Sequence, residues 1–283
     1  MTNHELVEFE RMSPEEVLAA RRRAAVVFLP VGPLEWHGPH LPLGTDGLAA
    51  HHVAVLVARQ TGGVVLPTMF VGTDSLRPRG REPQGLGALG VDTDQPVVGM
   101  DFPTFPVKSL YYHETVLGAV IRETVRLLKR EPWALIVVIN GHGGPNHKRM
   151  LQRIAQEESL SSSAEVLCAA TGAPNSGGDP GHASRSETSK MMALDGDLVH
   201  VDRLPARDAP LVYRDFGVVN GAAFDGQPSE GFAVPDHADP RLSSPEEGQA
   251  LVDGAVRHLV ELVTTRLAQT ASTVAHATSE RQN

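Results

Sequence analysis

This sequence has a single cysteine, no long apolar run and fewer basic than acidic residues. Cys168 is the only cysteine among the 283 residues, so no intrachain disulfide is possible, and this usage fits a reducing compartment. No apolar run approaches the roughly 20 residues of a membrane helix, and the N-terminus lacks the basic start and apolar core of a signal peptide. We therefore expect a cytoplasmic protein with no membrane segment.

Basic residues are fewer than acidic residues in this chain. The 34 Asp and Glu residues outnumber the 25 Lys and Arg residues, which gives a net charge of -9. The basic residues cluster only at 21–23 and 77–81, where a solvated helix face and a loop explain them. Because nucleic acids are bound through basic surfaces, we expect no nucleic-acid partner.

Nothing resembling a linker divides the chain, and 41% hydrophobic residues provide enough material for a sizeable core. We predict a single domain over residues 1–270, followed by a disordered tail at 271–283. Apolar runs predict strands at 24–32, 63–72, 134–140 and 164–171. Helical spacing and capping signals predict helices at 13–23, 44–63, 114–130, 146–158, 186–194 and 244–267. Strands alternating with helices predict an α/β fold, a three-layer sandwich with a mostly parallel sheet.

The first chemically informative stretch is LEWHGPHLPLGTD, residues 34–46, which follows the first predicted strand. In an extended segment residues i and i+2 point the same way, so Glu35 and His37 project together. Asp46 lies near the start of the next helix, and the intervening Gly and Pro residues fold it back towards them. Open α/β sheets place their sites at the carboxyl ends of strands, which is where this segment falls.

Two further stretches offer similar side chains. NGHGGPN, residues 140–146, follows the third predicted strand and brings His142 to the same sheet edge. GHASRSETS, residues 181–189, carries His182 on a loop and Glu187 five residues later. Loops on a rigid scaffold often position catalytic groups. Together the three stretches favour a functional site over separate structural roles.

Each stretch also has a purely structural interpretation. A buried histidine is often only hydrogen-bonded in the core, Asp46 is a possible helix cap, and NGHGG is a possible turn. Six other histidines have no such context, and we interpret them as surface or core residues: His51, His52, His147, His200, His237 and His258.

PVGPLEWHGPHLPLGTD, INGHGGPN and HASRSETS, in this order, resemble the motifs of the creatininase (creatinine amidohydrolase) family. Weaker similarity extends from FERMSPEEV to EEGQALVDGAVRHLVELV, so the resemblance covers nearly the whole chain. It implies a creatininase-like three-layer α/β/α fold, a homohexamer, and one or two divalent metal ions per chain. It also implies hydrolysis of C–N bonds in small amides, often cyclic.

Carried over residue by residue, the resemblance implies that Glu35, Asp46 and His142 hold a first metal. Asp46 would bridge to a second metal that also binds His37. Glu187 is predicted to be a ligand of the second metal, with a role as the base that manages the water's proton as the alternative. Nitrogen and oxygen ligands of this kind suit Zn, Mn or Fe(II).

The predicted mechanism is that of a metal-activated water. The water attacks the carbonyl carbon while a metal polarises the carbonyl oxygen. The leaving nitrogen needs a proton, and His182 is the predicted acid.

Three positions depart from the family pattern. Members that act on creatinine resemble NGHxEN, and Gly144 stands where they carry the glutamate that completes the second metal site. Pro145 is inserted before Asn146, and Ser184 replaces the usual glycine of HAG. These changes argue against creatinine as the substrate and make the second metal site depend on Glu187.

Two loops bear on the substrate. The segment 172–182 has no tryptophan, unlike the creatinine-acting members, and offers Asn175, Ser176 and Asp179. This lining suits a small polar, hydroxylated or extended substrate. The Gly- and Pro-rich segment 73–108 is a long loop that either contributes to the pocket or a subunit contact, or is only a surface loop.

The sequence thus predicts a metal-dependent amidohydrolase that cleaves a small cyclic or linear amide. The same chemistry would suit a peptide bond or a C–C bond beside a ketone. A metal-binding, non-catalytic subunit is the alternative from another class, suggested by Gly144 and Pro145. Retention of all six polar site residues argues against it, because buried charges are costly without a metal to compensate them.

Overall fold

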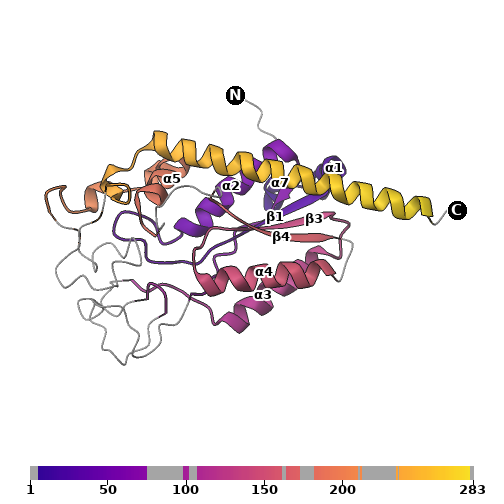
Figure 1. Cartoon of the computed structure of the whole chain (residues 1–283), viewed down its shortest axis with the longest axis horizontal. Helices are drawn as coiled ribbons and strands as arrows, with labels where there is room; N and C mark the ends of the chain where they lie inside the picture. Colours follow the sequence, from indigo (N-terminus) through magenta and orange to yellow (C-terminus); the bar gives the residue numbers. More distant parts are fainter. Residues whose placement is uncertain are drawn as a thin grey trace.

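The structure is a computed structural model that describes residues 6–74, 98–101, 107–160, 164–172, 182–209, 211, 234 and 236–280, with backbone only from 271. Its centre is a parallel sheet between two layers of helices (Figure 1). The strand order is β2-β1-β3-β4, and the strands are β1 (Val26–Val31), β2 (Val64–Val65), β3 (Leu135–Asn140) and β4 (Glu165–Ala170). The predicted parallel three-layer α/β architecture is confirmed.

The two central strands are buried on both faces, as their continuous apolar runs predicted. Side chains alternate between the faces. Val26 and Phe28 of β1 pack with α2 (Thr45–Thr61) and α7 (Pro245–Glu280). Leu29 and Val31 pack on the opposite face with α3 (Glu114–Leu128) and α4 (Pro145–Leu160).

The remaining helices lie at the edges of these layers. α1 (Pro14–Arg23) carries the predicted capping box of Ser13 and Glu16, and it packs in the same apolar cluster as α3 and α4. α5 (Arg185–Asp195) packs against α7. Short 3-10 helices occur at Phe9–Arg11, Gly196–Leu198, Val201–Arg203 and Pro240–Leu242.

The register of the sheet aligns the ends of three strands. Val31 of β1 pairs with Asn140 of β3, and Asn140 pairs with Ala170 of β4. The loops that follow these strands therefore leave the sheet side by side. One of them carries Glu35 and His37, and the next carries His142.

Several predicted boundaries were wrong. The second strand covers two residues instead of 63–72, because Pro67 has no N–H to donate to the ladder, although Met69 still forms a bridge with Val31. The last helix continues to Glu280, past the predicted end at 267. No Gly or Pro interrupts residues 267–280, so elongation of an existing helix costs little there. Disorder of the segment 271–283 stays a prediction.

Two predicted features are only partly described. Most of the 73–108 segment and most of the 172–182 loop, including Asn175, Ser176 and Asp179, lie outside the described residues. Among the helices that the structure describes, none has both the length and the apolar character needed to cross a membrane.

Candidate metal centre

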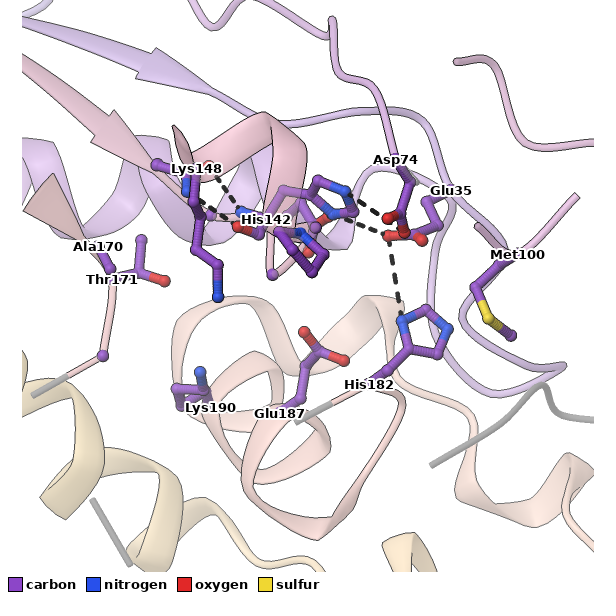
Figure 2. Close-up of a pocket in the computed structure, with 17 residues that line it drawn as sticks. Glu35, Asp74, Met100, His142, Lys148, Ala170, Thr171, His182, Glu187 and Lys190 are labelled. Atoms are coloured by element: carbon purple, nitrogen blue, oxygen red, sulfur yellow. Dashed lines mark hydrogen bonds and ion pairs between the residues drawn. The ribbon is translucent and has the colours of Figure 1, made fainter. Parts of the chain in front are cut away.

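A cavity of about 380 Å³ opens where the carboxyl ends of β1, β3 and β4 meet (Figure 2). Asn140 and Ala170, the last residues of β3 and β4, line it together with the loops that follow. Glu35, Asp46, His142, His182 and Glu187, which the sequence singled out, also line it. Five predicted site residues from the three stretches therefore face one space.

Close backbone packing brings the third strand's loop against α2. An added Cβ at Gly141 would overlap the backbone oxygen of Asp46, so only glycine allows this approach. The side chain of Asn140 then clamps the loop, accepting from the N–H of His142 at 2.9 Å and donating to its carbonyl at 2.8 Å. His142 is thereby held facing Asp46.

Asp46 lies in the first turn of α2, is 3% exposed, and faces two histidines at once. Its Oδ2 lies 2.9 Å from Nδ1 of His142, and its Oδ1 lies 3.4 Å from Nε2 of His37. Each carboxylate oxygen thus points to a different imidazole, the arrangement expected of a bridging ligand.

Two groups of potential ligand atoms share this carboxylate. In the first, Oε2 of Glu35 lies 3.2 Å from Nδ1 of His142. In the second, Oε2 of Glu187 lies 3.6 Å from Nε2 of His37. The atoms of His37, Asp46 and Glu187 are close enough to bind one ion. The structure therefore gathers the side chains that the resemblance assigns to two metals, although the third ligand atom grouped with Glu35 and His142 comes from Asp74.

His182 and Glu187 flank the start of α5. The N–H of Ala183, which has a φ of 52°, donates to Oε2 of Glu187 at 2.6 Å. Nε2 of His182 is 2.8 Å from the carbonyl oxygen of Trp36, so this nitrogen carries the proton and donates. Its Nδ1 is left facing Oε2 of Glu35 at 4.0 Å, and its ring lies against that of His37 with centroids 4.4 Å apart.

The electrostatics of the cluster are dominated by burial and by mutual attraction. Burial opposes the positive charge of His37, but the carboxylates of Glu187 and Asp46 outweigh it and raise the pKa of His37 to about 10. The pKa of His142 is raised in the same way by Glu35 and Asp46. Positive charge between these carboxylates is thus strongly favoured.

Burial is the largest cause of the pKa shifts of His182 and Glu187. Burial lowers the pKa of His182 to about 4, which leaves the ring neutral at pH 7. Burial also raises the pKa of Glu187 to about 7, because His37 and Lys190 offset only part of the cost of a buried charge.

The side chains fit a divalent metal ion. Oε2 of Glu35, Nε2 of His37 and Nε2 of His142 are buried and have no hydrogen-bond partner among the described residues. Buried carboxylates at this density require a compensating positive charge. Imidazole nitrogen and carboxylate oxygen form a ligand set that suits Zn, Mn or Fe(II).

The structure adds residues that the sequence analysis missed. Oδ2 of Asp74 lies 3.9 Å from Nε2 of His142. Asp74 follows the second apolar run of the sequence as Glu35 follows the first, and this position could have identified it as a candidate ligand. Tyr111 donates its hydroxyl to Oε1 of Glu35 from 76 residues away, and no local pattern indicates this contact. Lys148 and Lys190 also line the cavity.

The histidines that we interpreted as surface or core residues belong to none of the candidate metal-ligand groups among the described residues. His147, interpreted as a surface or core residue, is fully buried with its ring edge against His142 at 5.1 Å between centroids. His51 and His52 lie on α2, near Glu8 and Asp195.

Fold and site together define a class of protein. It is an α/β protein that gathers candidate metal ligands at the carboxyl ends of a parallel sheet. The family model described as creatinine amidohydrolase matches residues 10–263, and the chain belongs to the creatininase family. The resemblance inferred from the three motifs is confirmed, and membership of this family supports a hydrolase.

Individual relatives agree with this assignment. The mycofactocin precursor peptide peptidase of Mycobacterium ulcerans (strain Agy99) is 30% identical over 192 residues, which span 65% of this chain and 64% of that protein, less than two thirds of its length. The crystal structure of creatinine amidohydrolase (creatininase) matches 92% of this chain and 98% of its own, with a TM-score of 0.62 and 21% identity. Structures named as the Mn form and the Zn-Zn type of creatininase match with TM-scores of 0.63 and 0.62, at 21% and 20% identity, over 92% of this chain and 98% of theirs. At this identity they establish the shared fold.

Proposed function

We propose that this chain is a metal-dependent hydrolase that cleaves the C–N bond of a small polar amide, cyclic or linear. The observation that carries the proposal is the position of Asp46, whose two oxygens face His142 and His37 at the end of an open cavity. A shared carboxylate between two such groups is typical of dinuclear hydrolytic sites.

The proposed first metal is held by Glu35, Asp46 and His142, and the proposed second by Asp46, His37 and Glu187. Two of the matching creatininase structures are named for Mn and for a Zn-Zn pair, which supports either metal here, while the ligand set is equally suited to Fe(II). The resemblance implies one or two ions per chain, and a ligand role for Glu187 predicts two.

Glu187 is the residue on which the second ion depends. Gly144 supplies no carboxylate, and a side chain there would begin 2.5 Å from Nε2 of His142. Glu187 approaches from α5 instead, with Oε2 3.6 Å from His37. We therefore favour the ligand role for Glu187, with proton transfer as the alternative.

A divalent ion bound at this centre lowers the pKa of a water and polarises a carbonyl oxygen. His182 is the proposed proton-transfer residue, since its Nε2–H is fixed by the carbonyl oxygen of Trp36 and its Nδ1 faces the cluster. A neutral ring accepts a proton at Nδ1 and returns it to the leaving nitrogen, which completes C–N cleavage.

A peptide bond is the second candidate target, because the relative in Mycobacterium ulcerans is named a peptidase of a precursor peptide. The C–N bond of a peptide has the same electronic demands as that of a small amide. No residue described along the cavity favours a C–C bond beside a ketone, the other alternative.

The proposal is tested first by metal content per chain, measured by mass spectrometry on protein purified without chelators. We expect two ions in the wild-type chain, one in Glu187→Ala, and loss of both the ions and amide hydrolysis in Asp46→Ala, because Asp46 is the shared ligand. Glu157→Ala, which changes an exposed carboxylate on α4, serves as the control and should keep both ions.

Hydrolysis is measured on the same preparations with cyclic amides and short peptides, by mass spectrometry of the products. Full metal content and turnover in Asp46→Ala would show that the ligand assignment is wrong. A metal content unchanged by Glu187→Ala would move Glu187 to proton transfer. Metal binding without cleavage of any amide would support the non-catalytic alternative.

A further inference from the structure

The cavity has a basic side as well as an acidic one. Lys148, near the start of α4, and Lys190, on α5, both line it. Figure 2 shows their amino groups turned into the cavity on the same side, whereas Glu35, Asp74 and His182 lie on the other side.

Lys148 is exposed, and Lys190 offsets part of the charge of Glu187 on the same helix. Neither ammonium group has an ion pair with a described carboxylate, although other cations of the fold do. Lys129, for example, lies 2.8 Å from Glu158. An anion in this part of the cavity would be attracted by both ammonium groups.

We propose that Lys148 and Lys190 form an anion-binding subsite, and that the substrate carries an anionic group at the end turned away from the metal ligands. This inference rests on the proposed hydrolase function, and it adds the class of substrate. Thr171, at the end of β4, lines the same side and offers a hydroxyl to the anion.

The two sides of the cavity then have complementary tasks. The anionic group binds the two ammonium groups through charge-assisted hydrogen bonds, which fixes the direction of the substrate. The amide carbonyl is thereby directed to the ligands Glu35, Asp46 and His142. A volume of about 380 Å³ suits a molecule of one or two amino-acid units. Both a carboxylate and a phosphate carry the required charge.

The test uses hydroxamates, which chelate divalent metals, bound to the metal-loaded full-length protein and measured by calorimetry. Three probes share a spacer of two methylene groups between the hydroxamate and the far end, which is a carboxylate, a neutral carboxamide or a phosphonate. We expect the carboxylate or the phosphonate probe to bind at least about tenfold more tightly than the carboxamide, as one charge-assisted contact predicts. The tighter of the two identifies the anion.

Lys148→Gln and Lys190→Gln should each remove most of this preference, while affinity for the carboxamide probe and metal content stay within about twofold. Arg149→Gln, next to Lys148 but outside the cavity lining, is the matched control and should keep the preference.

Equal affinity of the wild-type protein for charged and neutral probes would overturn the subsite, and so would a preference that persists in the double lysine variant. The wild-type comparison requires no variant, so a failure of either variant to fold leaves it decisive. If no hydroxamate binds and the metal content is zero, the proposed metal centre is wrong and the subsite falls with it. Binding without preference refutes the subsite alone.

Discussion

Among single residues, Tyr111 has a specific effect on the proposed metal ligands because it sets the direction of Glu35. Its hydroxyl donates to Oε1 of Glu35, which leaves Oε2 facing His142 at 3.2 Å. The N–H of Met100 donates to the same phenol oxygen at 3.1 Å and holds it in place. Burial and the Glu35 charge raise the pKa of Tyr111, so the phenol stays a donor.

We expect Tyr111→Phe to weaken metal binding by about 10- to 100-fold, the usual effect of removing a hydrogen bond that orients a ligand. Competition with a chelator of known affinity measures this change. Tyr112→Phe is the control, since its side chain is 42% exposed and does not line the cavity. Unchanged metal affinity in Tyr111→Phe would show that the carboxylate holds its position without the phenol.

Among the elements, α3 and α4 are joined by a buried carboxylate. Glu158 of α4 is 3% exposed and accepts from Arg122, Arg126 and Lys129 at the α3 end, at 2.8 to 3.1 Å. Burial opposes its charge, yet Lys129 and Arg122 outweigh that cost and lower the pKa of Glu158. This network fixes one helix of the layer relative to the other, beneath the strands that carry the site.

Glu158→Gln should lower the free energy of unfolding by about 2 kcal/mol at pH 7, because it removes the charge of a buried carboxylate that accepts three charge-assisted hydrogen bonds. A carboxyl whose pKa is lowered in the folded state stabilises the fold above its unfolded pKa, and the gain is lost as the pH falls through the folded pKa. The difference between wild type and variant should therefore shrink below about pH 4.

Urea unfolding at several pH values measures both effects. Glu157→Gln, an exposed neighbour that pairs with Arg122, should change the free energy of unfolding by less than about 0.5 kcal/mol. An equal loss in both variants would contradict a special role for the buried position.

On the scale of the whole molecule, the hexamer implied by the family resemblance stays a prediction. The outer face of α3 exposes Val116, Val120 and Leu127, which are 51%, 37% and 50% exposed. Their spacing of four and seven residues places them on one stripe of the helix. Leu110 and Tyr112, just before α3, are also exposed. Apolar stripes of this kind are typical of contacts between subunits, so we assign this one to a second copy of the chain.

Light scattering coupled to size-exclusion chromatography should give the mass of a homo-oligomer. The family resemblance implies that this oligomer is a hexamer. Val116→Glu combined with Val120→Glu should shift the mass towards the monomer, because charges cannot be buried in the contact. Leu160→Glu, at a side chain that is 90% exposed on α4, adds a charge elsewhere and should leave the mass unchanged. A monomeric wild-type protein would refute the assembly.

The sequence by itself determined the class of fold and the candidate ligands within each of its three motifs. Apolar runs and capping residues are local signals, so the strands β1 and β3 and the capped α1 were predictable from neighbouring residues alone. The pairing of Glu35 with His37 was equally local, since it depends on alternation along one extended segment. The length of β2 and the end of α7 were not, because strand pairing and helix elongation are decided beyond the local pattern.

Only the tertiary structure decided which loops meet and how their atoms face each other. The contacts of Asp74 with His142 and of Tyr111 with Glu35 join segments 68 and 76 residues apart, and the basic pair of Lys148 and Lys190 comes from different helices. A sequence pattern records no distances between such segments. The position of Asp46 between His37 and His142 arises because the sheet register and the close packing at Gly141 bring three chain segments together.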